Sequence, residues 1–360
     1  MRVRRVLIAS MLFVGAPVAA LGITAPVGVT VQTVATGVPQ PTNITVDSSG
    51  RMWVTSGGNI TAPSDGVWLV RAPGAKPVHV IRSLFTALGL TWYQDELYVA
   101  YVQPYGDADA VTHAGAVTAY SGFDGSSFAS SRTVLSKVPI GEHTMDTILP
   151  GPGRRLYVGV GSTYDATPSP RRISGSVVSV LPSGLGRRIE AYGLRNPYGL
   201  AFIPGTTQLL ITDNGRDDMG TTRPPDELNI QNVATKALNM GFPKCWGQGG
   251  APCRGLSPPL ALFPPHASAD GMAVASSFGT YGLSAFVAQN GSAFPAEHTG
   301  NNVVRVALSR QGGTWTGKVV PFASGFRKFD PLGAVLGPDG ALYVTLWTSG
   351  AVVRFVPRGA

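Results

Sequence analysis

The sequence predicts an all-β fold, a six-bladed β-propeller, from three observations. Glycine and proline are frequent, with 46 and 29 of 360 residues, while charged residues make up only 13% of the chain. This balance is typical of many short strands joined by tight turns. No stretch after residue 30 repeats apolar residues with the 3.6-residue period of an amphipathic helix. Finally, one strand–turn–strand unit recurs along the chain, which indicates a repeat architecture.

The repeated unit is a hairpin of two apolar strands, and six copies follow one another. The sixth is the clearest, with Gly337-Pro-Asp-Gly340 as its turn. Four copies carry an aromatic residue at the centre of the second strand (Trp53, Tyr98, Tyr157 and Tyr343), where it can pack between neighbouring sheets. The copies span residues 42–55, 88–100, 145–159, 198–212, 271–274 with 285–288, and 332–345.

A third strand follows several hairpins and often begins with glycine. Radial blades of this kind protect their edges by closing into a circle. The early strand over 29–34 is expected to complete the last blade and close the ring. A β-sandwich also has alternating strands, but it does not repeat one hairpin at such spacing. Third strands are expected over 66–70, 115–120, 175–180, 302–306 and 351–355.

The N-terminus is typical of an export signal. A start with three arginines precedes an apolar run over 6–18, and small residues allow cleavage after Ala20. An uncleaved N-terminal anchor is the alternative. We therefore expect a signal peptide over 1–20, a propeller domain over 27–360 and no transmembrane domain in the mature chain. The expected location is periplasmic or extracellular.

The charge pattern excludes a nucleic-acid partner. Once the three signal arginines are removed from the 28 basic residues, 25 remain against 20 acidic ones, a net charge of +5. These charges are scattered, with no lysine or arginine run and no interleaved aromatic residues. A nucleic-acid footprint needs clustered positive charge.

The two cysteines predict one disulfide. Cys245 and Cys253 are eight residues apart across a glycine-rich turn. In an exported chain this arrangement favours a disulfide over a metal site, which needs more ligands nearby. The bond is expected to pin one loop, with a stabilisation of roughly 2–3 kcal/mol.

Loops beside the hairpins carry the candidate chemistry. His143 precedes the third hairpin, where an imidazole can accept a proton from a hydroxyl group; a structural or solvated histidine is the alternative. The acidic stretches 213–218 and 224–229 can offer oxygen ligands to a hard cation such as Ca²⁺, or form solvated turns. Motifs of serine hydrolases, metalloproteases and phosphate-binding loops are absent.

An ordered set of motifs carries a family resemblance. The most specific part begins with Gly193-Leu-Arg-Asn-Pro-Tyr-Gly-Leu-Ala-Phe202. It continues through Thr212–Asp218, Pro225–Asn229 and Gly241–Gly247. Together with later fragments, these motifs resemble the soluble quinoprotein glucose/sorbosone dehydrogenase family, and the resemblance covers residues 35–356. It implies a six-bladed propeller that binds pyrroloquinoline quinone (PQQ) and Ca²⁺ at the channel mouth. It also implies oxidation of a sugar, an aldose or a sorbosone-like compound, with an external electron acceptor.

The resemblance assigns roles to residues by position. His143 resembles the base that takes the hydroxyl proton while hydride passes to PQQ, and Glu142 stands as its acidic neighbour in the cofactor site. Arg195 resembles the residue that contacts cofactor and substrate. Asn196 resembles its cofactor-binding neighbour. Residues at two further positions are expected to offer backbone carbonyls to Ca²⁺: Gly215 and Arg216.

The chain also departs from the family pattern. Asn290 stands in a segment where sorbosone-type relatives usually carry a histidine. Before the last hairpin, Arg327 and Lys328 are the candidates to bind the quinone carboxylates, but their spacing is shifted and Asp330 falls near an expected basic position. Two alternatives therefore stay open. One is a non-catalytic propeller that binds carbohydrate or protein and has lost PQQ; the other is a Ca²⁺-dependent propeller hydrolase of the lactonase type.

Overall fold

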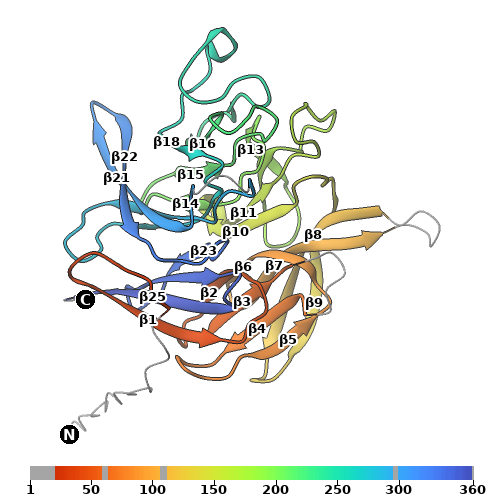
Figure 1. Cartoon of the computed structure of the whole chain (residues 1–360). Helices are drawn as coiled ribbons and strands as arrows, with labels where there is room; N and C mark the ends of the chain where they lie inside the picture. The colour runs from red at the N-terminus through yellow and green to blue at the C-terminus, as the bar shows by residue number, and fades with distance from the viewer. Residues whose placement is uncertain (1–20, 59–63, 106–111, 295–298, 359–360) are drawn as a thin grey trace, which may run out of the picture.

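The computed structural model describes residues 21–58, 64–105, 112–294 and 299–358. In these ranges the chain forms 25 strands in six sheets, together with two three-residue 3-10 helices, η1 (Pro152–Arg154) and η2 (Ala251–Cys253). The sheets are arranged as the blades of a six-bladed β-propeller (Figure 1). The predicted fold class is confirmed, while the expected signal peptide over 1–20 lies outside the described residues.

Each blade begins with an antiparallel hairpin at one of the six predicted repeat units, so the repeat count is confirmed. The inner hairpins are β2–β3 (Pro41–Val46, Met52–Ser56), β6–β7 (Phe85–Tyr93, Glu96–Tyr105), β10–β11 (Met145–Gly151, Arg155–Val160), β14–β15 (Leu200–Phe202, Gln208–Asp213), β19–β20 (Ala269–Ala275, Ser284–Gln289) and β23–β24 (Pro331–Leu336, Leu342–Leu346).

Two further strands complete each blade, and all five predicted third strands are present. The third strand of blade 4, Pro225–Asn232, was expected as part of an acidic turn and is instead a buried strand. The outer strands are β4–β5 (Gly66–Val70, Val78–Arg82), β8–β9 (Thr112–Phe123, Phe128–Val138), β12–β13 (Ser176–Val180, Arg188–Tyr192) with β17 (Leu238–Asn239), β16 and β18 (Pro225–Asn232, Ala261–Pro265), β21–β22 (Asn302–Gln311, Thr314–Ala323), and β25 with β1 (Ala351–Pro357, Val29–Thr36).

Strand β1 closes the ring as predicted. It pairs antiparallel with β25, from Val29 opposite Pro357 to Thr36 opposite Ala351. The C-terminal part of the chain forms three strands of this blade, β23, β24 and β25. The N-terminal strand β1 is its outer strand (Figure 1). This closure leaves no blade without its fourth strand.

The hairpin turns use their polar residues to fix the register. In the first unit, Asp47 Oδ1 accepts hydrogen bonds from the backbone of Ser49 at 2.9 Å and of Arg51 at 3.0 Å. Gly50 supplies the positive φ, 77°, that such a turn requires. The other oxygen of Asp47 accepts the indole N–H of Trp53 at 2.8 Å. The turn thereby holds the aromatic residue that packs below it.

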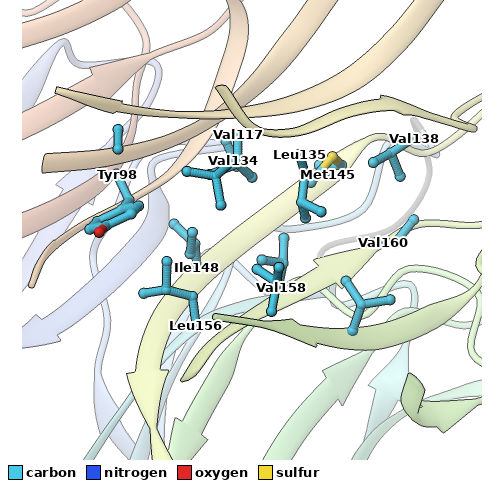
Figure 2. Packing of buried hydrophobic residues seen from close by; sticks show 14 residues of the cluster. Tyr98, Val117, Val134, Leu135, Val138, Met145, Ile148, Leu156, Val158 and Val160 are labelled. Carbon is cyan, nitrogen blue, oxygen red and sulfur yellow. The ribbon is translucent and has the colours of Figure 1, made fainter. Parts of the chain in front are cut away.

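Apolar side chains from neighbouring blades form the core. Between blades 2 and 3, Tyr98 and Val117 belong to one buried cluster with Ile148, Leu156 and Val158 (Figure 2). The four aromatic residues predicted to pack between sheets all do so, at 5% exposure or less: Trp53, Tyr98, Tyr157 and Tyr343.

Shortening Ile148 to valine should lower the free energy of unfolding by about 0.5–1.5 kcal/mol, because one buried methyl group is lost in close packing. Ile148 is 2% exposed between two blades. Urea denaturation of wild type and variant measures the change. Val78→Ala, at a position 45% exposed, should stay within about 0.5 kcal/mol of wild type. Equal losses at both positions would contradict the interblade core as the main source of stability.

The strand order places one set of loops on one face of the ring. In each blade the second strand ends at the face where the inner strand starts, because the two strands are antiparallel. Loops entering the inner strands therefore meet the loops that leave the second strands. A cavity of about 230 Å³ lies between the inner strands of the blades, with Asn43, Thr91, Thr147 and Leu200 among its lining residues.

Candidate active site at the channel mouth

His143, Asp165 and Arg195 come together on this loop face from three different loops. His143 leads into β10, Asp165 lies between β11 and β12, and Arg195 forms the corner before β14. The Asp165 carboxylate forms an ion pair with the Arg195 guanidinium. Its Oδ1 atom also lies 4.0 Å from Nε2 of His143. One carboxylate thus lies between the candidate base and the candidate cofactor-binding arginine.

Hydrogen bonds fix both the side chain and the backbone of Arg195. Its Nη2 donates to Asp217 Oδ2 at 2.7 Å, and its Nη1 donates to the backbone oxygen of Asn214 at 3.2 Å. The corner itself is fixed by Asp213, whose Oδ1 accepts the backbone N–H groups of Arg195 at 3.0 Å and Asn196 at 2.7 Å. With only 4% exposure, Arg195 presents a guanidinium whose orientation is set before any ligand arrives.

The His143 imidazole is neutral at neutral pH. Burial and the nearby charge of Arg195 lower the pKa of His143 to about 3, although the charge of Asp165 opposes the shift. Within the part of the chain that the structure describes, its buried Nε2 atom has no hydrogen-bond partner. A neutral imidazole with an unpartnered nitrogen can accept a proton from a bound hydroxyl group.

Glu142 does not occupy the place expected for it. Its side chain is exposed, and the carboxylate nearest to His143 is that of Asp165. Glu142 and His143 lie in a bend before β10, where the Glu142 side chain is directed to solvent. The acidic neighbour of His143 in space is therefore Asp165.

The turn after β15 presents free carbonyl groups. The backbone N–H of Gly215 donates to Asp226 Oδ1 at 2.8 Å, which fixes this turn against β16. Among the described residues, no hydrogen bond reaches the carbonyl oxygen of Gly215 or of Arg216. Unpaired backbone carbonyls are ligands that Ca²⁺ accepts. No three side chains of His, Cys, Asp or Glu within the described ranges lie close enough together to hold a metal ion.

Five carboxyl groups lie buried around this face, at 7% exposure or less. Burial raises the pKa of Asp226 to about 6 and that of Glu227 to about 7, while backbone hydrogen bonds oppose both shifts. Burial also raises the pKa values of Asp213 and Asp270 to about 8. For the fifth group, Asp146, burial and then the charges of Asp270 and Asp213 raise the pKa well above its ordinary value.

Glu227 anchors the loop that contains the disulfide. Its Oε1 accepts the backbone N–H of Gly247 at 2.5 Å. Cys245 and Cys253 are bonded, with their Cα atoms 4.9 Å apart. On the other side of the loop, the Pro243 carbonyl accepts a hydrogen bond from Arg216 at 2.9 Å. The disulfide loop therefore forms one wall of the site.

Stability should depend on pH through Glu227. Its folded pKa of about 7 exceeds the ordinary value of 4.5, so the folded state binds more protons than the unfolded state between these pH values. This contribution to stability is present below pH 4.5 and is lost as the pH rises to about 7. The Tm of Glu227→Gln relative to wild type should therefore rise across this window. Glu142→Gln, at an exposed position, serves as the control, and parallel Tm curves for Glu227→Gln and wild type would refute the assignment.

The fold was compared with those of known proteins. No protein-family model matches the chain. A family AA12 carbohydrate-active enzyme from Trichoderma reesei, in a calcium structure, superposes with a TM-score of 0.77 at 19% identity, over 94% of this chain and 97% of the other. The holo PQQ domain of pyranose dehydrogenase from Coprinopsis cinerea gives 0.74 at 19% identity, over 95% and 99%. The chain has the fold of the quinoprotein sugar dehydrogenases.

Two further relatives complete the comparison. The PQQ-bound aldose sugar dehydrogenase of Streptomyces coelicolor has this quinoprotein fold and superposes with a TM-score of 0.69 at 19% identity, over 92% of this chain and 99% of the other. A curated protein of Borreliella burgdorferi, described as uncharacterized, is 22% identical over 215 residues. That match covers 59% of this chain and 53% of the relative, so the chain spans about half the relative's length.

The loops after β20 and before β23 account for the departures seen in the sequence. Asp330 is buried, and its oxygens accept hydrogen bonds from the backbone of Arg327 at 3.2 Å and of Ser349 at 2.7 Å. Asn290 donates to the backbone oxygen of Phe329 at 3.0 Å. Both residues therefore bind loop backbone. Arg327 and Lys328 are exposed on the same face and form no ion pair within the described ranges.

Sequence reasoning did not single out Asp165 or Asp146, and it included Asp217 only as part of the acidic stretch 213–218, without its contact to Arg195. Asp165 and Asp217 lie in loops after second strands, which give no periodic signal. The carboxylate Asp146 lies inside the third repeat unit, and its position as an acidic residue at the start of an apolar strand was a signal that could have identified it.

Within the described ranges, no helix is long and apolar enough to span a membrane.

Proposed function

We propose that this protein is an exported quinoprotein dehydrogenase that oxidises a sugar, with PQQ as its redox cofactor and Ca²⁺ beside it. One observation carries the proposal: a half-buried, neutral histidine and a buried arginine both lie beside the Asp165 carboxylate at the channel mouth. The likeness in fold to PQQ-binding sugar dehydrogenases supports it. PQQ, when bound, supplies an ortho-quinone that accepts two electrons from the C–H bond of the sugar.

The residues of the site divide the remaining tasks. Nε2 of His143 accepts the proton of the sugar hydroxyl group, since it is buried and unpartnered among the described residues. The negative charge of Asp165, 4.0 Å from Nε2, stabilises the imidazolium that forms. The Arg195 guanidinium favours the negative charge that accumulates beside it during the reaction. The Arg195 side chain is 5% exposed and that of His143 15%, which strengthens these interactions relative to water.

The chain also fits the cofactor and its cation at several points. The free carbonyls of Gly215 and Arg216 would bind Ca²⁺, and Asn196 and Arg195 lie at the adjoining corner. PQQ carries three carboxylates, which favour cationic partners. Arg327 and Lys328 are exposed on the same face and available for them.

Replacing both Arg327 and Lys328 by alanine should weaken PQQ binding by roughly tenfold, because each lost charge-assisted contact contributes about 0.7 kcal/mol at an exposed position. Fluorescence quenching by added PQQ measures the dissociation constant. Arg358→Ala, which removes an exposed charge beyond the last strand, is the control. An unchanged constant in the double variant would remove these two residues from the cofactor site.

The direct test titrates purified protein with PQQ, with and without Ca²⁺, and then adds a panel of aldoses in the presence of an artificial acceptor dye. Ca²⁺-dependent binding followed by sugar-driven bleaching of the dye is the expected result. Absence of PQQ binding at tens of micromolar would overturn the proposal.

A non-catalytic binding propeller is the second candidate, and the pairing of Arg195 favours it. The guanidinium already contacts two carboxylates, Asp165 and Asp217, so an anionic cofactor must compete with both. Carbohydrate binding without any PQQ binding in the same titration would support this candidate.

A further inference from the structure

Three successive blades place a polar side chain at one equivalent position. Asp146 lies two residues before Ile148, which is opposite Val158 in its hairpin. Tyr198 lies two residues before Leu200, which is opposite Ile211. In blade 5, Asp270 has the same position relative to Met272 and Val287. The residues two places after this position, Ile148, Leu200 and Met272, line the central cavity.

These three side chains lie close enough to perturb one another. Burial, and then the charges of Asp270 and Asp146, raise the pKa of the Tyr198 phenol. Burial and the charges of Asp270 and Asp213 act in the same way on Asp146. Asp146 is 1% exposed, Asp270 2% and Tyr198 6%. Two carboxyl groups and a phenol therefore share one dry region at the end of the cavity.

Asp146 differs from the other buried carboxyl groups of this face. Each of the other four accepts at least one hydrogen bond; Asp270, for example, accepts from Asn214 Nδ2 at 2.8 Å and from Ser268 Oγ at 2.9 Å. Among the described residues, no donor reaches Asp146, and its Oδ2 atom is fully buried. A buried carboxylate without a partner is strongly unfavourable.

Two neutral oxygens of the same region also lack partners. The hydroxyl oxygen of Tyr198 and Oδ1 of Asn214 are buried and unpaired within the described ranges. The amide of Asn214 is oriented by its hydrogen bond to Asp270, so its carbonyl oxygen is the free end. Unpartnered buried polar atoms in a native structure point to a missing ligand or water.

We propose that Asp146, Tyr198, Asn214 and Asp270 bind a hard cation of the calcium class at the end of the central cavity. Such cations take neutral amide, hydroxyl and water oxygens as well as carboxylates, with roughly six to eight oxygen ligands in total. The site therefore has two carboxylates, an amide oxygen and a hydroxyl oxygen, and it does not require a group of three His, Cys, Asp or Glu side chains, of which the described ranges hold none. The cation would link blades 3, 4 and 5.

This site is separate from the carbonyl groups of Gly215 and Arg216. It is built from side chains of β10 and β19, from Tyr198 two residues before β14 and from the residue after β15, and no cofactor atom is needed to complete it. Cation binding there is accordingly expected without PQQ, and its test does not depend on the proposed function.

The test uses the full mature protein without PQQ. The protein is stripped with a chelator and titrated with Tb³⁺, whose luminescence is excited through nearby tyrosine, and Ca²⁺ is then added in competition. Wild type should bind saturably and release Tb³⁺ to Ca²⁺. Asp146→Asn, which keeps the side-chain shape, should bind at least tenfold more weakly, whereas the matched change Glu142→Gln on the exposed surface should have no effect. Ca²⁺ should raise the Tm of wild type and of Glu142→Gln, but not that of Asp146→Asn.

Metal analysis of protein that has not been stripped covers the case of a tightly held ion. One equivalent per chain is expected in wild type and less in Asp146→Asn. If Asp146→Asn does not fold, Tyr198→Phe replaces it and should weaken Tb³⁺ binding. Wild-type protein with neither bound metal nor saturable Tb³⁺ binding would overturn the proposal, as would a variant with wild-type affinity. Metal binding that persists while PQQ binding fails would leave this site standing and remove only the proposed function.

Discussion

Replacing His143 by alanine should lower kcat by roughly 10²–10⁴-fold, the contribution expected of a positioned general base. The imidazole is buried beside Asp165 and Arg195, so no water molecule in bulk solution can take its place efficiently. Binding of PQQ should be largely retained, because the histidine is assigned to the substrate proton. Steady-state assays with a reconstituted enzyme, together with a PQQ titration, separate the two effects.

The control for this variant is Glu142→Ala, since Glu142 is next in sequence but exposed. It should retain wild-type kcat. The pH profile adds an independent reading. With the pKa of His143 lowered to about 3 from its ordinary 6.5, the base is deprotonated throughout the neutral range, and kcat/KM should show no acidic limb near pH 6.5. Normal turnover in His143→Ala would remove this residue from the mechanism.

Arg195→Ala should weaken PQQ binding and lower kcat/KM by roughly 10²–10³-fold, because a preorganised charge at the reacting centre is removed. The side chain donates to Asp165, Asp217 and the Asn214 carbonyl, so its loss also frees the loops that form the site. Asp165 and Asp217 are 34% and 54% exposed, and water can solvate them. The fold should therefore survive the substitution.

Arg195→Lys distinguishes charge from geometry. Lysine keeps the positive charge but cannot reproduce the planar fork of donors, so an intermediate loss is expected. Circular dichroism and the urea midpoint check that each variant is folded. Wild-type PQQ affinity in Arg195→Ala would show that the cofactor lies elsewhere.

The repeat units could be predicted because each is a local structure. A hairpin such as 332–345 is recognised by its apolar strands and its Asp-Gly turn. Both signals lie within the hairpin and do not depend on distant parts of the chain. Blade 5 also has an aromatic residue at the centre of its second strand, although the prediction did not name it. This residue is Phe286, opposite Ala273, with 0% exposure.

The site was harder to predict because its chemistry contradicts local rules. Strand β16 begins with Pro225-Asp-Glu, which is typical of a turn, yet Asp226 and Glu227 are buried and bind backbone N–H groups of other loops. Asp165 reaches Arg195 across 30 positions of sequence. Such a contact follows from the stacking of blades and leaves no trace in sequence periodicity.

The pairing of β1 with β25 also determines when the molecule can finish folding. Its partners, Val29 and Pro357, leave the ribosome tens of seconds apart at a synthesis rate of roughly 5–20 residues per second. Throughout that interval, β1 is an unpaired edge that invites association with other chains. Contacts of such long sequence separation are also the slowest to form. The nascent chain can therefore build its blades one after another, but the last one is completed only once β25 has been synthesised, and a chaperone that shields β1 would act during that delay.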